Sequence, residues 1–135
     1  MATAYSVSIV TPEESVYEGE AELVIARSPE GEFGIMAGHI PFLAALVPGL
    51  VTVVSGGTRE SYVVPGGFLE ASRGGESDDY HVIVLADDAE EAGDIDAAEA
   101  RRRIEEAKEK ADEDRDERME AEMAAALAGP ELGRG

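Results

Sequence analysis

The chain has 135 residues, a hydrophobic content of 44% and no cysteine. This length allows one domain with or without a small appendage, and the lack of cysteine excludes disulfides, thiolate metal sites and cysteine nucleophiles. The formal net charge of −19 makes nucleic acid a poor partner, because phosphates are repelled and no basic stripe releases counterions. An anionic lipid surface is disfavoured for the same reason.

Neither a membrane-crossing segment nor an export signal is expected. No apolar run approaches the roughly 20 residues that cross a bilayer. Residues 1–10 lack the basic and apolar regions of a signal peptide. We therefore expect a soluble, cytosolic chain without direct membrane insertion.

The first part of the chain has the pattern of short strands. In residues 5–11, YSVSIVT, apolar and polar residues alternate with the period of a half-buried strand. Further strands are expected at residues 15–20, 22–28, 50–55, 60–65, 67–72 and 81–87, separated by Gly- and Pro-containing turns. This spacing predicts an antiparallel β-sandwich over residues 1–94.

Residues 31–49, GEFGIMAGHIPFLAALVPG, are unusually rich in glycine and proline. A phosphate-binding loop would require Lys and Ser/Thr after the glycines, at the start of a helix. Here Gly31, Gly34 and Gly38 are followed by His39, Ile40 and a proline. The stretch is therefore interpreted as turns that present a surface to a partner.

The candidate catalytic and metal-binding residues form no recognisable constellation. His39 and His81 are the only histidines and lack metal-ligand spacing. Ser28 and Ser55 could serve as nucleophiles, but nothing in the sequence places them beside a base. We expect no metal site, no cofactor and no catalytic residue, and a histidine that hydrogen-bonds a turn or an interface.

The composition changes after about residue 94, where Ala, Glu and Arg dominate. An acidic cluster at residues 112–117 is the predicted break between two helices that form an antiparallel hairpin over residues 95–128, with a flexible tail at 129–135. One face of the first helix and the facing stripe of the second comprise Ala97, Ala100, Ile104, Ala107 and Ala111, and Met119, Met123 and Leu127. Because alanines bury little apolar area, the hairpin is expected to lean on another surface or to move. The stripe can serve either as an intramolecular seam or as a partner-binding face.

An ordered set of motifs resembles the epsilon subunit of bacterial F-type ATP synthases. The motifs are SPEGEFGIMAGHIPFLAALVPGLV, then VPGGFLEAS, then VIVLADDAEEAGDID, and the resemblance extends over residues 3 to about 128. It implies an N-terminal β-sandwich followed by a two-helix domain, the architecture that the residue patterns predict independently. The turn before His81 is longer than the family pattern.

The resemblance implies a non-catalytic rotor subunit of the central stalk. Such a subunit grips the gamma subunit and rests on the c-subunit ring, so that proton-driven rotation reaches the catalytic head; it would lie at the cytoplasmic face of the bacterial membrane as a peripheral part of the complex. The implied c-ring-facing loop consists of Ser28, Glu30, Gly31, Glu32 and Phe33. The implied gamma-facing residues are Gly38, His39, Pro41, Phe42 and Leu43.

Relatives that bind ATP on the hairpin carry an Ile/Leu-Asp-x-x-Arg-Ala motif. The matching residues here are Ile95, Asp96, Glu99 and Ala100, so a glutamate stands in the place of the arginine and weak ATP binding is expected. The resemblance also leaves open a regulatory contact between the hairpin and the catalytic beta subunit. The alternative from another class is a free-standing acidic β-domain that acts as an adaptor or ligand-binding module.

Overall fold

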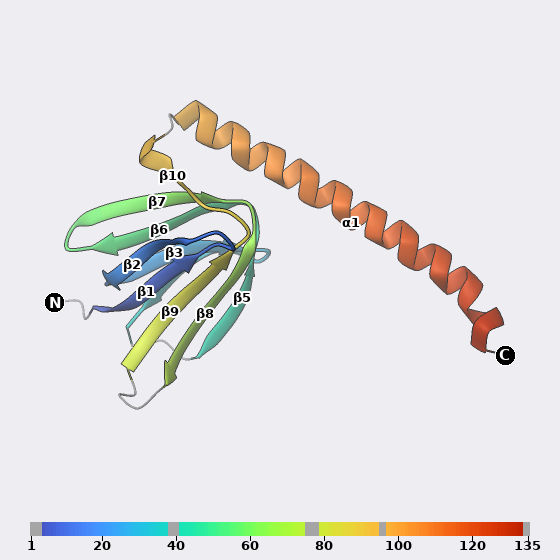
Figure 1. The fold of residues 1–135 in the computed structure, drawn as a ribbon, viewed down its shortest axis with the longest axis horizontal. Coiled ribbons are helices and arrows are strands. Elements are labelled where there is room, and N and C mark those ends of the chain that lie inside the picture. The colour runs from blue at the N-terminus through green and yellow to red at the C-terminus, as the bar shows by residue number, and fades with distance from the viewer. Residues whose placement is uncertain (1–3, 38–40, 75–78, 95–96, 134–135) are drawn as a thin grey trace.

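The computed structural model of the chain describes residues 4–37, 41–74, 79–94 and 97–133, of which 128–133 and Asp94 are described by their backbone alone. It consists of a β-sandwich and a long C-terminal helix (Figure 1). The strands are β1 (Tyr5–Val10), β2 (Ser15–Ala21), β3 (Leu23–Ser28), β4 (Gly31–Met36), β5 (Phe42–Leu46), β6 (Gly49–Ser55), β7 (Thr58–Val64), β8 (Gly67–Gly74), β9 (Asp79–Ala86) and β10 (Glu90–Glu91). A short 3-10 helix, η1 (Ala92–Asp94), precedes the helix α1 (Ala97–Gly133).

The strands form two five-stranded sheets. Sheet A has the order β2-β1-β9-β8-β5, and sheet B has the order β10-β7-β6-β3-β4. The predicted sandwich is thus confirmed, but the expectation of purely antiparallel pairing is wrong for one pair, because β1 and β9 run parallel. These two strands are joined by most of the domain rather than by a tight turn, so no local signal fixes their relative direction.

The core lies between the sheets and follows from the two-residue period of the strands. In β1 the side chains of Tyr5, Val7 and Ile9 are buried, while Ser6 between them is exposed. The largest fully buried side chains are Ile9, Ile35, Leu69, Val7, Val24, Val64, Val82 and Val84. Apolar side chains from both inner faces therefore pack into one layer, which is the main source of stability of a sandwich.

The interpretation of residues 31–49 as turns is wrong for two segments, since β4 and β5 both lie in this stretch. In β4 the side chains of Phe33 and Ile35 turn inward, whereas Glu32 and Met36 are exposed. The alternation is present in the sequence, but glycines at two of the six positions obscured it. Phe33 and Phe42 pack against each other with ring centroids 5.2 Å apart, which joins the edge strands of the two sheets.

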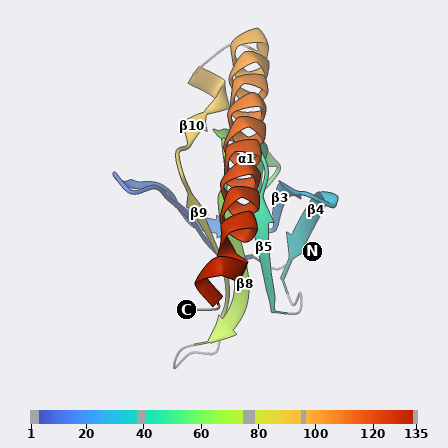
Figure 2. The same cartoon turned by 90° about the vertical axis from the view of Figure 1, so that its right-hand side faces the viewer.

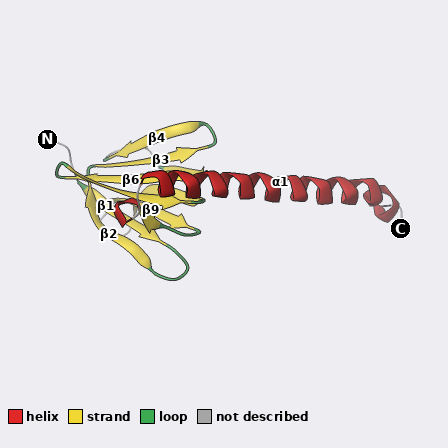
Figure 3. Cartoon of the chain, turned by 90° about the horizontal axis from the view of Figure 1, so that it is seen from above, coloured by secondary structure: helices red, strands yellow, loops and turns green. Residues whose placement is uncertain are grey.

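The C-terminal region is one helix of 37 residues, so the prediction of a two-helix hairpin is not matched by this structure. Figures 1 and 3 show an uninterrupted coil that projects beyond the sandwich. The predicted break contains no Gly or Pro, and an ion pair between Arg115 and Asp112, 2.6 Å apart and one turn from each other, is compatible with a continuous helix there. Backbone of residues 129–133, expected in the tail, belongs to the end of α1, and Arg134 and Gly135 lie outside the described residues.

Only the start of α1 touches the sandwich. The helix begins near β10 and η1 (Figure 2) and contacts β7. Every side chain described from residue 108 to 127 is exposed, including Met119, Met123 and Leu127. Among the described helices, none is long and apolar enough to span a membrane.

Candidate functional site

The outer face of sheet A carries a cluster of exposed apolar side chains. Leu43, Phe68 and Leu85 are 67%, 55% and 55% exposed. Directly paired residues of neighbouring strands point to the same face of a sheet, and Ala45 pairs with Phe68, which pairs with Leu85. One row further, Leu43 pairs with Glu70, which pairs with Ile83. We call the set Leu43, Ala45, Phe68, Ile83 and Leu85 the outer patch.

The outer patch contains one of the five predicted gamma-facing residues. Leu43 belongs to it, and Pro41 is also exposed. Phe42 instead turns inward onto Phe33, and Gly38 and His39 lie outside the described residues. The sequence analysis did not include Phe68 and Leu85 among the site residues. A signal for them is present, because the strands GFLEAS and HVIVLAD place apolar residues on both faces.

The predicted c-ring-facing loop is the tight turn between β3 and β4. The buried Ser28 hydroxyl accepts a hydrogen bond from the Glu30 amide, at 3.2 Å, and donates to the Gly31 carbonyl, at 3.3 Å. Gly31 has φ +126°, a backbone conformation that residues with a side chain rarely adopt. Ser28 and Gly31 therefore shape the turn, Phe33 packs inward, and the side chains of Glu30 and Glu32 are exposed to solvent together with Pro29.

A groove runs between the first turns of α1 and the outer face of sheet B. A cavity of about 430 Å³ lies over Leu50, Ser61, Ala92, Ala97, Ala100, Arg101 and Ile104. A second, of about 290 Å³, continues past Leu50 and Ile104 to Arg27, Glu32, Pro48, Gly49 and Lys108. The groove thus combines an apolar floor with three cationic side chains and one carboxylate, that of Glu32, in a strongly acidic protein. We call it the helix groove.

The residues of the degenerate ATP motif lie at the start of α1. Ile95 and Asp96 fall outside the described residues, and Ala100 lines the helix groove. Glu99 pairs with Arg102 and with Arg103, whose Nε lies 3.0 Å from the Glu99 carboxylate in each case. Hydrogen bonding to Glu99 and the charge of Glu106 raise the pKa of Arg102. Two of the three consecutive arginines are therefore already engaged with carboxylates.

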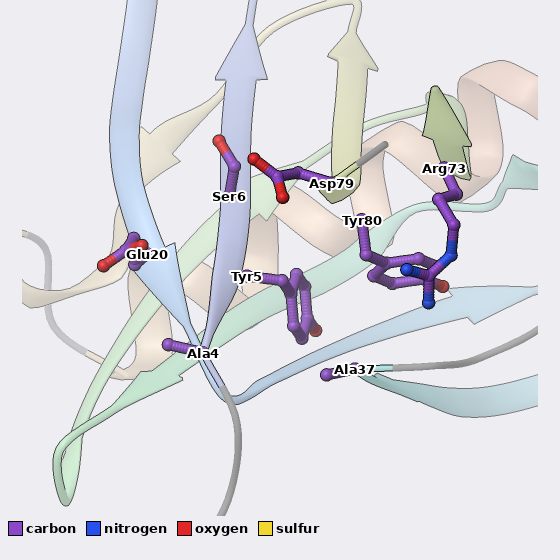
Figure 4. Close-up of a pocket in the computed structure, with 8 residues that line it drawn as sticks. All are labelled: Ala4, Tyr5, Ser6, Glu20, Ala37, Arg73, Asp79 and Tyr80. Carbon is purple, nitrogen blue, oxygen red and sulfur yellow. The ribbon is translucent and has the colours of Figure 1, made fainter. Parts of the chain in front are cut away.

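A cavity of about 510 Å³ opens at the end of the sandwich where β1 and β9 begin (Figure 4). The Arg73 guanidinium lies 5.9 Å from the centroid of the Tyr80 ring, and Glu20 and Asp79 add carboxylates to the lining. Burial raises the pKa of the Tyr80 hydroxyl, an effect that the positive charge of Arg73 partly offsets. The cavity is mixed in charge, with one guanidinium and two carboxylates in its lining.

The described residues offer little to catalysis. No group of three or more His, Asp or Glu side chains could hold a metal ion in the described ranges. Ser72 and His81 are paired across β8 and β9, with Oγ and Nε2 3.1 Å apart. They lie on the outer face of sheet A, and neither lines any of the cavities above. The pair is therefore interpreted as a cross-strand hydrogen bond.

A two-sheet sandwich that exposes a cluster of large apolar side chains on one outer face is typical of a domain that binds another protein. Residues 4–92 match the family model of the ATP synthase delta/epsilon chain β-sandwich domain. The chain is 42% identical over 121 residues to the ATP synthase epsilon chain of Myxococcus xanthus, covering 88% of this chain and 85% of that one. It is 41% identical over 119 residues to the sodium-ion-specific epsilon chain of Propionigenium modestum, covering 86% and 82%. The chain belongs to the epsilon-chain family of ATP synthases, which confirms the resemblance and the expectation of a non-catalytic subunit.

Solved structures share the fold. A chain in the OSCP/F1/c-ring part of the Euglena gracilis mitochondrial ATP synthase matches with a TM-score of 0.62 at 24% identity, over 78% of this chain and 64% of that one. A chain of the Tetrahymena thermophila mitochondrial ATP synthase central stalk and c-ring matches with a TM-score of 0.54 at 15% identity, over 82% and 97%. At these identities the likeness supports the sandwich architecture.

Proposed function

We propose that this subunit sits in the central stalk of an F-type ATP synthase and grips the gamma subunit through the outer patch. The observation that carries the proposal is the patch itself, since a contiguous exposed apolar surface marks a protein interface. Leu43 and Phe68 are more than half exposed in a chain whose net charge of −19 otherwise favours solvation. Burying such side chains yields about 25 cal/mol per Å².

The sheet explains why the contact can carry torque. The patch residues belong to three neighbouring strands, β5, β8 and β9, which are held in register by backbone hydrogen bonds. Side chains fixed on such strands move as one unit, unlike side chains on a loop. A broad contact on a stiff sheet therefore transmits rotation with little relative movement of the contacting side chains.

The experiment measures the affinity of the gamma subunit for single-residue variants. Phe68→Glu and Leu85→Glu are expected to weaken binding at least tenfold, about 1.4 kcal/mol or more, because each places a charge in the apolar interface. Met36→Glu is the matched control, since Met36 is 59% exposed but lies on sheet B. Equal weakening by all three variants, or by none, contradicts the proposal.

The β3–β4 turn then faces the polar loops of the c-ring. Its support is the rigid geometry of Ser28 and Gly31, which presents the exposed carboxylates of Glu30 and Glu32 at a fixed place. The subunit is held peripherally at the cytoplasmic face of the bacterial membrane by these two contacts. Chemical cross-linking from a Glu30→Cys variant in the assembled synthase tests the assignment of this turn to the c-ring. A cross-link to gamma alone argues against it.

The single helix is one of two states, and in the other its second half folds back as an antiparallel hairpin. Three features support this: the exposed stripe of Met119, Met123 and Leu127, the acidic cluster at 112–117, and the cationic rim of the apolar helix groove. An acidic, apolar-striped segment complements such a rim. The extended helix would reach toward the catalytic beta subunit and slow ATP hydrolysis.

Charge limits that regulation. Residues 112–135 carry eight acidic and three basic residues, so they are repelled by an acidic partner, and the repulsion is strongest at low salt. ATP hydrolysis by the reconstituted catalytic head is therefore expected to change little at low ionic strength when the full chain is replaced by residues 1–94. A large activation on truncation contradicts weak inhibition.

ATP itself is expected to bind weakly at the start of α1. Glu99 stands where the family motif has an arginine, and it also engages Arg102 and Arg103, which could otherwise meet a phosphate. Calorimetric titration of the wild-type chain is expected to give no measurable heat at micromolar ATP. Micromolar affinity would contradict this assignment.

A further inference from the structure

One basic side chain joins α1 to the sandwich. The guanidinium of Arg103 forms an ion pair through Nη1 with Glu90 of β10. Its Nε lies 3.0 Å from the carboxylate of Glu99, one turn earlier in α1. β10 is itself paired with β7, so the contact ties the helix to the edge of sheet B. We call Glu90, Glu99 and Arg103 the Arg103 clamp.

The clamp is partly shielded from water. The side chains of Arg103, Glu90 and Glu99 are 35%, 42% and 30% exposed. Arg103 meets two carboxylates at once, which restricts the guanidinium to one plane. Two simultaneous ion pairs in one plane fix the direction of α1 relative to the sandwich, whereas a single exposed ion pair does not.

The apolar contact between α1 and the sandwich involves too few large side chains to fix the direction of the helix. Next to the helix groove the helix contributes Ala97, Ala100 and Ile104, two of which are alanines. Beyond position 107 every described side chain of the helix is exposed. The contact surface also contains open cavities rather than close packing.

We propose that the Arg103 clamp sets the angle at which α1 leaves the sandwich and acts as its salt-sensitive hinge lock. About 30 residues of α1 lie beyond Arg103, a lever of about 45 Å at 1.5 Å per residue. A rotation of about 10° at the clamp therefore moves the end of the helix by roughly 8 Å. The angle set by the clamp therefore determines which positions the C-terminal segment can reach, whichever partner it meets.

The neighbouring Arg102 provides a matched control. Its guanidinium pairs with Glu99 and Glu106, both within α1, and its side chain is 58% exposed. Arg102 thus shares Glu99 with the clamp, but both of its ion pairs lie within α1 and neither reaches the sandwich. Replacing it removes the same charge and a similar helical ion pair without touching the link to Glu90.

The test measures the distribution of distances between the sandwich and the helix. Because the chain contains no cysteine, Ser55→Cys and Glu113→Cys, both at exposed positions, allow two nitroxide labels and pulsed electron paramagnetic resonance. In the full-length chain we expect one narrow distribution at low salt. Glu90→Gln and Arg103→Gln should each broaden it at least twofold, and the double variant should broaden it no further than either one, because both remove the same pair. Arg102→Gln should leave the width unchanged.

Salt gives an independent readout on the unmodified clamp. Raising the salt from ~0.05 M to ~1 M shortens the screening length to about 3 Å, so the wild-type distribution should broaden toward that of Arg103→Gln, which itself should not change. Circular dichroism should show the same helix content throughout. The proposal is overturned if the wild-type distribution is already broad at low salt, if Arg103→Gln stays narrow, or if Arg102→Gln broadens as much.

Discussion

Tyr5 and Tyr80, on the adjacent strands β1 and β9, pack edge to face with ring centroids 5.4 Å apart and ring planes at 81°. Both rings are buried, with 4% and 7% of their surface exposed. The Tyr5 hydroxyl donates a hydrogen bond to the carbonyl of Ile35 in the opposite sheet. The Tyr80 hydroxyl has no hydrogen-bond partner among the described residues. The two rings therefore contribute similar packing but differ in hydrogen bonding.

This difference predicts opposite effects of removing each hydroxyl. Tyr80→Phe is expected to raise the free energy of unfolding by about 1 kcal/mol, because it removes a buried polar group that lacks a partner. Tyr5→Phe is expected to lower it by about 1 kcal/mol, because it removes the buried hydrogen bond from the Tyr5 hydroxyl to the Ile35 carbonyl. Urea titration of the two variants measures both. A Tyr80→Phe variant less stable than Tyr5→Phe contradicts the assignment of hydrogen bonds.

The buried tyrosines also predict the alkaline limit of stability. Burial raises the pKa of Tyr5 and Tyr62 well above the ordinary value of 10.0, and the hydrogen bond to Glu60 raises that of Tyr62 further. Above pH 10 the unfolded chain loses these protons while the folded chain keeps them, so folding is favoured less as the pH rises. The contribution of each residue is fully present below pH 10 and falls by about 1.4 kcal/mol per pH unit above it.

Chemical denaturation between pH 8 and about pH 11 tests this limit. The ionisation of Tyr5 and Tyr62 should change the free energy of unfolding little up to pH 10 and should lower it above pH 10. Tyr62→Phe should reduce the slope above pH 10, whatever its effect on stability at neutral pH. An unchanged slope would show that Tyr62 ionises in the folded state at its ordinary pKa.

The motif VPGGFLEAS contains a glycine that the fold requires. Gly67 has φ +143°, and a Cβ at this position would lie 2.1 Å from the carbonyl oxygen of Leu85. Gly67→Ala is therefore expected to destabilise the sandwich by at least roughly 3 kcal/mol, from backbone strain together with steric overlap. Gly74→Ala, at the other end of β8, is the control, since its Cβ meets nothing within 4 Å. Thermal unfolding that shifts equally in both variants argues against this reading of Gly67.

Much of the sandwich is predictable from local sequence, and the exceptions have physical reasons. Seven strands follow from alternation of the kind seen at Val7, Ser8 and Ile9 in β1. The sequence does not indicate β4 because its two glycines hide the alternation, nor β5 because its five residues are all apolar and do not alternate with polar ones. The parallel pairing of β1 with β9 has no local signature. The acidic run at 112–117 was expected to end a helix, but charges alone permit a helix whose neighbours pair at i,i+3.

The candidate surfaces were less accessible to sequence reasoning. Leu43 was predicted from the family resemblance, but its neighbours Phe68 and Leu85 come from strands far apart in the chain and meet it only through the register of sheet A. Glu99 is a similar case. The sequence shows only that Glu99 replaces the arginine of the family motif, whereas the fold shows that Glu99 pairs with Arg103, which in turn pairs with Glu90. Residues 38–40, which were expected on the gamma side, lie outside the described residues.

The chain is expected to bind gamma through the outer face of sheet A, and co-elution of the two proteins in size-exclusion chromatography measures this binding. The purified wild-type chain and the gamma subunit of the same synthase should elute as one complex. The Phe68→Glu variant, shown by circular dichroism to be folded, should elute separately from gamma, while Met36→Glu should still co-elute. Separate elution of the wild-type chain, or undiminished co-elution of Phe68→Glu, would show that gamma does not bind through the outer patch.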